Sequence, residues 1–408
     1  MIVPNVTWPL SQLPMYLMVD DGAPLLNLDH WEQPHEEHVP IIPNHFLHQF
    51  VEGIGLRGLR GKFTVLPYPM GLGRIDQSLP GIAAKQREEF LITVRDELEP
   101  FFDITPEILT HLNALDIRHH LYPLPFPEKR MMPYHDVASL TQYFRIALEI
   151  LTQAGLHPAG MTSPGTFGIE AEERYAEAVI RAFDEQRRVA VPFYYLHTDS
   201  ASPVVVPRVQ EIDGNVAVHL PSSHGDPLWP TKYGRPSTID ALLDPRGQSG
   251  RIRQLVVNRS PIGFHTHWSS LYSDGTSTGL KELFVLVDRI HEHFGPMIRW
   301  IRCSELAQYT VGIAQTHVTA HESESGIKIT VDSRGTVPLF TLTCPNTSPL
   351  AVTINGKSLR QAASQQSNAW WESHGDTVLS WDLTPPSNEI LITLKRSPMR
   401  VNGSAERP

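Results

Sequence analysis

From residue 15 to about residue 310, short apolar runs alternate with longer amphipathic runs, and few folds are compatible with this alternation. The runs 15–19 (MYLMV) and 61–69 (GKFTVLPYP) predict buried strands, and 45–54 (HFLHQFVEGI) predicts a helix. Further helices are expected over 85–102, 139–156, 171–188 and 279–294, and further strands over 189–197, 262–268 and 297–302. Alternating strands and helices are typical of parallel β/α folds. We therefore predict an α/β fold, a distorted (β/α)7–8 barrel over residues 1–314.

The pattern changes near residue 315. Short alternating strands are predicted over 326–332, 339–345, 350–356, 377–383 and 389–396, separated by turn residues. Asn355-Gly356 is a strong signal for a hairpin turn. We expect residues 315–400 to form a small β-sandwich, and residues 401–408 to form a tail.

Charge and hydropathy exclude several classes of protein. The 408-residue chain has a formal net charge of -10 and a pI near 6.0, which argues against a nucleic-acid partner because binding phosphates requires a basic face. No apolar run approaches the length of a membrane span, so no membrane partner is expected. The first residues lack the features of a signal peptide, which predicts a cytoplasmic protein. Cys303 and Cys344 are expected to be core thiols.

Two adjacent aspartates, Asp20 and Asp21, end the first predicted strand and precede Gly22. Parallel β/α folds place their active sites at this edge of the sheet. Neighbouring side chains on a strand point to opposite faces, so the two carboxylates need different roles. One could bind a cation while the other accepts a proton from water. The alternative is a turn in which the carboxylates cap the loop backbone.

Two histidines, His265 and His267, lie two residues apart on a predicted late strand, so both imidazoles leave the same face. They could bind a divalent metal together, or one could be a ligand beside an acid–base group. Trp268 follows, and an aromatic ring at a strand end can serve as a platform for a sugar. The alternative is a pair of interior, hydrogen-bonded histidines.

Further candidates lie between residues 103 and 168. Glu107 and His111 are four residues apart, a spacing that gives them a shared face on a helix or a strand. Thr162 lies in a loop punctuated by Gly and Pro, and its hydroxyl could line a substrate cleft; the alternative is a plain connecting loop. Other histidines that could complete a site are His119, His120 and His135.

The order of these motifs resembles the polysaccharide deacetylase superfamily over residues 15–310. The resemblance rests on Asp-Asp-Gly after the first strand, a His-bearing segment after the third, the Pro/Gly loop 162–168 (TSPGTFG) and the late strand 263–268 (GFHTHW). It implies a distorted barrel, a general base at Asp20, a divalent metal (usually zinc) bound by Asp21, and a general acid at His265 or His267. Two positions depart from the family pattern: Leu115 stands four residues after His111, where the family has a second metal-binding His, and Thr-Ser-Pro replaces Arg-x-Pro.

We assign the residues of the site as follows. Asp20 and His267 are the expected catalytic residues. The expected metal ligands are Asp21, His111 and His265, although His119, His120 or His135 could supply the third ligand instead. Substrate binding is assigned to Glu107, Thr162 and Trp268.

Three functions are compatible with this site. The first is metal-dependent hydrolysis of a carbohydrate, by removal of an N- or O-acetyl group, with Zn²⁺ as the expected cofactor. The second is a glycoside hydrolase with paired carboxylates, Asp20 or Asp21 with Glu107. The third is a carbohydrate-binding protein that keeps the barrel without catalysis.

Overall fold

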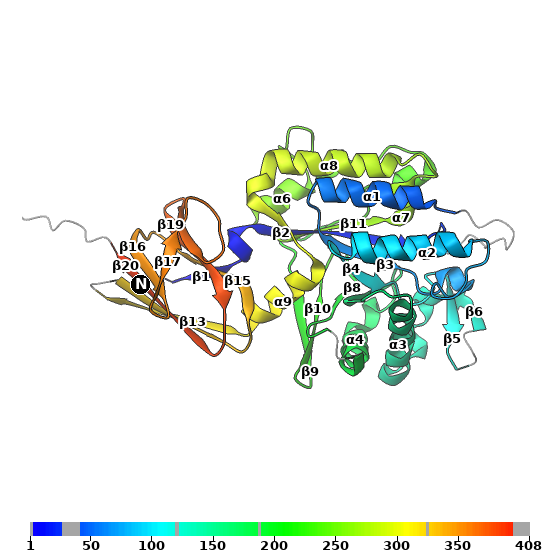
Figure 1. Ribbon diagram of the computed structural model, residues 1–408, viewed down its shortest axis with the longest axis horizontal. Coiled ribbons are helices and arrows are strands. Elements are labelled where there is room, and N and C mark those ends of the chain that lie inside the picture. Colours follow the sequence, from blue (N-terminus) through cyan, green and yellow to red (C-terminus); the bar gives the residue numbers. More distant parts are fainter. Residues whose placement is uncertain (1–2, 27–40, 119–121, 187–188, 324–325, 395–408) are drawn as a thin grey trace, which may run out of the picture. The chain divides into compact units, whose positions relative to one another are not determined.

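The chain divides into two compact units, Gln12–Val311 and Met1–Ser11 together with Gly312–Pro408. The computed structural model describes residues 3–26, 41–118, 122–186, 189–323 and 326–394 (Figure 1). The expectation that the first residues belong to the barrel is wrong. Strand β1 (Asn5–Thr7) pairs antiparallel with β15 (Val337–Cys344), and so belongs to the C-terminal unit. The predicted tail 401–408 lies outside the described residues.

A parallel sheet contains the first strand of the Gln12–Val311 unit. Its order is β11-β2-β3-β4, and β12 also pairs with β2. The strands are β2 (Leu13–Gly22), β3 (Gly61–Val65), β4 (Phe102–Pro106), β11 (Ile262–His267) and β12 (Ile298–Trp300). Every residue of β2 is buried, as expected for a central strand covered on both faces. All these strands are parallel, so their carboxyl ends lie at one edge.

A second sheet continues from β4. Its order is β7-β8-β10-β9, with only β9 antiparallel to its neighbour. The strands are β7 (Gly160–Thr162), β8 (Phe193–Tyr195), β9 (Arg208–Ile212) and β10 (Asn215–His219), and a separate hairpin comprises β5 (Asn113–Asp116) and β6 (Tyr122–Pro127).

Backbone hydrogen bonds join the two sheets at two places. The Ile108 N–H donates to the Thr162 carbonyl at 2.9 Å, and the Ser223 N–H donates to the Gly263 carbonyl at 2.9 Å. The unit is therefore a mixed α/β structure whose sheets curl into a half-barrel. The finer expectation, seven or eight β/α repeats in a distorted barrel, stays a prediction.

Helices lie along the strands of this unit. In Figure 1, α1 and α8 run side by side along β2 and β11, and α3 lies beside α4. The helices are α1 (Asn44–Leu56), α2 (Ala84–Thr93), α3 (Val137–Gln153), α4 (Glu172–Gln186), α5 (Ile239–Leu242), α6 (Arg251–Val257), α7 (Trp268–Tyr272), α8 (Thr278–Phe294) and α9 (Cys303–Ala314). The short 3₁₀ segments of this unit are η2 (Pro69–Gly71), η4 (Glu128–Arg130), η5 (Met132–Tyr134), η6 (Ile169–Ala171), η7 (Trp229–Tyr233) and η8 (Gly295–Met297), whereas η1 (Pro9–Ser11) belongs to the other unit.

Helix ends follow the local sequence in α3 and depart from it after α2. The Asp136 side chain accepts the Ser139 N–H at 2.8 Å at the start of α3, and Gly155 (φ 82°) follows its last turn. The helix predicted over 85–102 ends earlier than expected. A π-helical turn η3 (Val94–Leu98) follows α2. Phe102 is buried and already begins β4, because it pairs with Gly61 of β3 in the sheet.

The C-terminal unit contains the strands expected after residue 315. They are β13 (Thr316–Ser323), β14 (Gly326–Ser333), β15, β16 (Pro349–Ile354), β17 (Lys357–Gln361), β18 (Ala369–Ser373), β19 (Asp376–Leu383) and β20 (Ser387–Leu394). Asn355 and Gly356 form the β16–β17 turn with positive φ at both positions, which confirms the hairpin. The strand order is β1-β15-β19-β18-β17-β16-β20-β14-β13, antiparallel except for β17–β18. This pairing does not define two stacked layers, so the sandwich stays a prediction.

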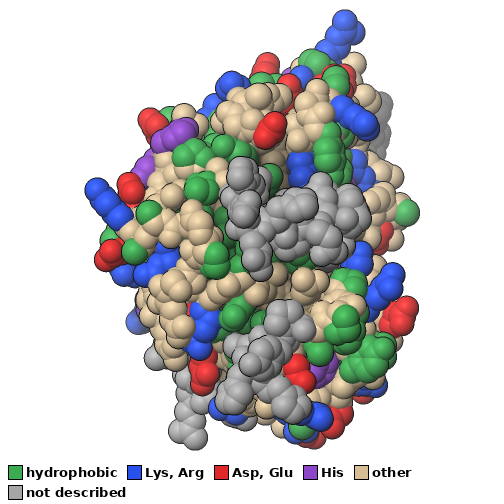
Figure 2. Space-filling view, turned by 90° about the vertical axis from the view of Figure 1, so that its right-hand side faces the viewer, with side chains coloured by type: hydrophobic (Ala, Val, Ile, Leu, Met, Phe, Trp, Pro, Cys, Tyr) green, Lys and Arg blue, Asp and Glu red, His purple; other side chains and the backbone are tan. Residues whose placement is uncertain are grey.

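The surface carries charges of both signs. On the face drawn in Figure 2, Lys and Arg side chains alternate with Asp and Glu side chains among the described residues. Within the part of the chain that the structure describes, no helix has the length and apolar character needed to cross a bilayer.

Candidate active site

Asp20 and Asp21 end β2 at the edge of the sheet where the neighbouring parallel strands also end. The pairing of β2 with β3 shifts register between Val19 and Gly22, and Asp21 has φ 66°. As expected for adjacent residues, the two carboxylates contact different groups. Gly22 fits here because a Cβ at this position would lie 2.1 Å from the Thr64 carbonyl oxygen.

Asp21 belongs to a cluster of two carboxylates and one imidazole. Asp21, Glu107 and His111 each place one potential ligand atom within 4.8 Å of the others. His111 Nε2 lies 3.1 Å from Asp21 Oδ1 and 3.3 Å from Glu107 Oε1. The Asp21 N–H donates to Glu107 Oε2 at 2.9 Å, and the Thr64 hydroxyl donates to the same oxygen at 3.3 Å.

A buried carboxylate, Glu128, positions the loop that carries His111. It accepts the backbone N–H groups of Leu109, Thr110 and His111, the last at 2.8 Å. The Tyr143 hydroxyl donates to Glu128 Oε1 at 2.5 Å, the oxygen that also accepts the Leu109 N–H. Burial raises the pKa of Glu128 to about 7, against the opposing effect of these hydrogen bonds. His111 has φ 64°, so this network also holds a residue in the left-handed region.

The donor set of the Asp21 cluster fits a divalent cation. Burial raises the pKa of Asp21, and burial together with the Asp21 charge raises the pKa of Glu107 to about 8. Asp21 Oδ1 is buried and has no hydrogen-bond partner among the described residues, although His111 Nε2 faces it. Two buried carboxylates beside an imidazole are costly alone, and a cation would offset that cost. Asp21, Glu107 and His111 could hold this ion.

Asp20 forms a second network with Lys62 and His265. The Lys62 ammonium is fully buried and bonds to Asp20 Oδ1, while His265 Nε2 lies 3.0 Å from Asp20 Oδ2. Burial opposes the charge of Asp20, but Lys62 and His265 lower the pKa of Asp20 below its usual range. His265 Nδ1 has no hydrogen-bond partner among the described residues. The Tyr195 ring packs 5.3 Å from the His265 ring.

His267 forms a third network with Asp226. Its Nδ1 lies 2.8 Å from Asp226 Oδ2, and the same oxygen accepts the Ser270 hydroxyl at 2.8 Å. Burial works against protonation of His267, yet the Asp226 hydrogen bond and the Asp21 charge raise the pKa of His267 to about 9. The half-buried Trp229 ring contacts His267 with centroids 4.7 Å apart. The His265 and His267 rings lie 4.6 Å apart, so both side chains leave one face as the spacing predicts.

The structure brings together most of the predicted site residues, in different groups from those expected. Asp21 and His111 share a cluster, but Glu107 completes it instead of standing apart as a substrate-binding residue. His265 bonds to Asp20, because strand pairing places Asp20 beside the carboxyl end of β11. His135 packs against Tyr143 and lies outside the cluster, and His119 and His120 lie outside the described residues.

Two substrate-binding predictions are wrong. Trp268 is 1% exposed, and its ring packs against Phe46, Phe50 and Phe63 at 4.7–5.4 Å, so no ring face is available to a sugar. Thr162 is fully buried and its hydroxyl lies 3.0 Å from that of Thr105. Both side chains are therefore buried in the interior of the unit.

Sequence reasoning missed several residues of these networks, among them Lys62, Asp226, Glu128 and Tyr195. Lys62 offered a signal, because a lysine inside a predicted buried strand needs a charged partner. Asp226, Glu128 and Tyr195 offered none, because each lies far along the chain from the group it contacts.

Comparisons with known proteins give distant likenesses only. No protein-family model matches the chain, and no curated protein matches it. Among solved structures, a provisionally assigned glycoside hydrolase/deacetylase from Parabacteroides distasonis is 10% identical with a TM-score of 0.42, covering 83% of this chain and 82% of its own. Glycoside hydrolase family 30 xylanases from Clostridium acetobutylicum and Clostridium papyrosolvens are each 10% identical, with TM-scores of 0.28 and 0.27; both cover 96% of this chain, and 97% and 98% of their own. These scores are too low to assign a family or an activity.

Proposed function

We propose that this protein is a metal-dependent hydrolase that removes an N- or O-acetyl group from a carbohydrate. The observation that carries the proposal is the cluster of Asp21, Glu107 and His111, in which two buried carboxylates and an imidazole place potential ligand atoms within 4.8 Å of one another. The carbohydrate and the acetyl group are inferred from the resemblance of the Asp-Asp-Gly and GFHTHW motifs to the polysaccharide deacetylase superfamily.

The metal would be held by Asp21, Glu107 and His111. When bound, a divalent cation such as Zn²⁺ would supply a Lewis acid that polarises the acyl oxygen of the substrate. The ligands meet the needs of such an ion, since two carboxylates supply negative charge and an imidazole supplies nitrogen. Glu128 contributes indirectly by holding the loop that carries His111.

The remaining groups would move protons. Hydrolysis adds a water oxygen to the acyl carbon and breaks the bond to the sugar nitrogen or oxygen. We assign removal of the proton from the attacking water to the Asp20–His265 pair. Lys62 keeps Asp20 ionised, and His265 Nδ1 could accept the proton because it has no hydrogen-bond partner among the described residues. His267 would protonate the leaving group, because Asp226 keeps its imidazole protonated at neutral pH.

One observation favours glycoside hydrolysis as a second candidate. Glu107 has its pKa raised to about 8, as a general acid requires, while Asp20 is held ionised, as a nucleophile or base requires. The two reactions give different products. Acetate release supports the first candidate, and shortened sugar chains support the second.

The test measures bound metal and products in matched variants. Wild-type protein, purified without chelator, should contain about one divalent ion per chain by mass spectrometry and release acetate from acetylated oligosaccharides. Asp21→Ala and His111→Ala should lose both the ion and the activity. The control is His157→Ala, which removes an exposed histidine paired with Glu99 outside the cluster. The proposal fails if the wild type holds no stoichiometric ion, or if the cluster variants keep metal and activity. Glycan binding without turnover, unaffected by chelator, would identify a non-catalytic protein instead.

A further inference from the structure

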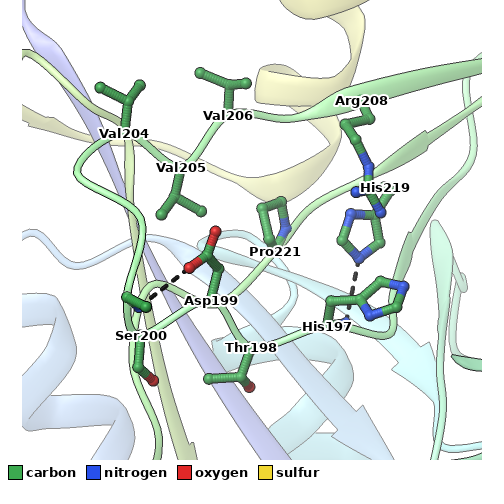
Figure 3. Close-up of a pocket in the computed structure, with 11 residues that line it drawn as sticks. His197, Thr198, Asp199, Ser200, Val204, Val205, Val206, Arg208, His219 and Pro221 are labelled. Carbon is green, nitrogen blue, oxygen red and sulfur yellow. Dashed lines mark hydrogen bonds between the residues drawn. The ribbon is translucent and has the colours of Figure 1, made fainter.

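A cavity of about 530 Å³ lies beside β8 and β10, outside the three networks described above. Figure 3 shows its walls, which come from the segment after β8, the start of β9, and His219 and Pro221 at the end of β10. This volume lies within the range of small-molecule sites, about 300–1,000 Å³. β8 is parallel to β7, and Thr162 at the end of β7 forms a parallel bridge with Glu107 of the candidate active site, so the segment after β8 begins on the side of the unit where these strands end.

One wall of the cavity is apolar and fixed in place. Val204 and Val206, which line this wall, are 45% and 46% exposed. Between them, the Val205 side chain is buried and its backbone is anchored: the Val205 N–H donates to Ser260 Oγ at 2.9 Å, and the Ser260 hydroxyl reaches the Val205 carbonyl at 3.2 Å. Pro221 extends this apolar surface.

The facing wall offers both donors and an acceptor. Arg208 Nη2 is held by both Glu172 oxygens at 2.9 Å, which fixes the guanidinium at the cavity wall. The His197 N–H donates to His219 Nε2 at 3.2 Å, and this bond assigns the ring proton of neutral His219 to Nδ1. His219 is 1% exposed, and its Nδ1 has no hydrogen-bond partner among the described residues. Asp199 supplies carboxylate oxygens, one of which accepts two backbone N–H groups.

Glu172, His197 and His219 also lie close enough together for a metal, but their bonds do not suit one. Both Glu172 carboxylate oxygens already accept hydrogen bonds from Arg208 Nη2. His197 Nε2 also lies 2.9 Å from Glu172 Oε2. His219 Nε2 is used by a backbone N–H. A cation here would also face the Arg208 guanidinium, so the cluster is better explained as the support of the polar wall.

One hydrogen bond connects the cavity to the candidate active site. Thr198, which lines the cavity, shares a hydrogen bond of 2.9 Å with the Tyr195 hydroxyl. The Tyr195 ring in turn packs on His265 and lies 5.2 Å from the Lys62 ammonium. The Thr198 and Tyr195 side chains therefore link the cavity wall to the residues assigned to proton transfer.

We propose that this cavity binds a neutral pyranose ring of a glycan, adjacent to the sugar that carries the reacting group. The proposal rests on the proposed function for the identity of the neighbouring sugar. A pyranose has an apolar C–H face, which suits Val204 and Val206, and hydroxyls that can both accept and donate. Those hydroxyls would accept from Arg208 and His219 and donate to Asp199. A purely anionic ligand is less suitable, because the Asp199 carboxylate would repel it.

The test compares activity on a monosaccharide and on a trisaccharide, in the wild type and in a variant of the apolar cavity wall (the wall variant). The probes are N-acetylglucosamine and its β-1,4-linked trimer, with acetylated xylose and xylotriose as an O-acetyl pair. For at least one pair, wild type should favour the trimer by about tenfold or more in kcat/KM for acetate release. The double variant Val204→Asp/Val206→Asp should lose this preference while its activity on the monosaccharide stays unchanged. Val285→Asp is the matched control, because Val285 is 44% exposed on α8 outside the cavity.

A binding measurement separates failure of this inference from failure of the proposed function. Calorimetry with chelator-treated protein should give a trimer affinity that the wall variant loses and Val285→Asp keeps. If no acetate is released but this pattern is seen, the proposed function fails and the cavity assignment stands. The inference is overturned if the wild type does not favour either trimer in turnover or binding, or if the wall variant, shown to be folded by circular dichroism, keeps the preference.

Discussion

Replacement of Asp226 by Asn should lower the pKa of His267 and change how stability depends on pH. In the wild type, Asp226 Oδ2 lies 2.8 Å from His267 Nδ1 and accepts the His267 backbone N–H at 3.2 Å. The amide of Asn can preserve the shape of this contact but not its charge. Burial, which disfavours the protonated ring, would then be opposed only by the more distant Asp20 and Asp21 carboxylates.

The size of the effect follows from the shifted pKa. His267 has a pKa of about 9, against about 6.5 for an unperturbed histidine. At about 1.36 kcal/mol per pH unit, this difference corresponds to on the order of 3 kcal/mol of folding free energy. Because the folded pKa is the higher one, this stabilisation is fully present below pH 6.5 and is lost as the pH rises through about 9. Asp226→Asn should remove a large part of it at low pH and little at high pH.

Two measurements test this prediction on metal-free protein. An NMR titration of the histidine ring signals should give one wild-type imidazole with a pKa near 9, which moves down in Asp226→Asn. Urea unfolding should show a stability gap between the two proteins that is larger near pH 6 than near pH 9.5. Asp240→Asn is the control, because Asp240 is 70% exposed and pairs with Arg289 at the surface.

A wild-type His267 that titrates near 6.5 would refute this reasoning, and so would an Asp226→Asn variant with an unchanged titration. A stability gap that does not depend on pH would mean that Asp226 acts through packing and neutral hydrogen bonds alone.

Three further substitutions test the buried networks by urea unfolding. Glu128→Gln should lower the free energy of unfolding by about 1–3 kcal/mol and weaken metal binding, because the loop of His111 loses a charged acceptor; unchanged metal affinity would contradict its positioning role. Lys62→Met should cost about 3–5 kcal/mol, because Asp20 then remains buried without its cation; a neutral effect would mean that water or His265 compensates. Trp268→Ala should cost about 3–5 kcal/mol and Trp268→Phe clearly less, since the ring fills the aromatic core; equal small losses would place the ring outside the core.

Local sequence determined the kind of most elements and the position of several site residues. The periodicity of apolar residues predicted β2, α1, α3 and β11, and Asn355-Gly356 predicted the β16–β17 turn. The aspartates and the late histidines could be placed at strand ends, because a strand's end is marked by the residues that immediately follow it. These features depend on neighbours within a few positions, and a single sequence contains that information.

Tertiary structure decided which of these groups act on one another. Asp20 contacts Lys62, 42 residues away, and His265, 245 residues away. Asp21 instead lies in a cluster with Glu107 and His111. Trp268 follows His265 and His267 directly, but its side chain packs in the core. Strand β1 pairs with β15 instead of joining the half-barrel. Local periodicity fixes the face of an element on which a side chain lies. The partner it meets there depends on strand register and on the packing of segments distant in the chain, and these are set only when the whole fold forms.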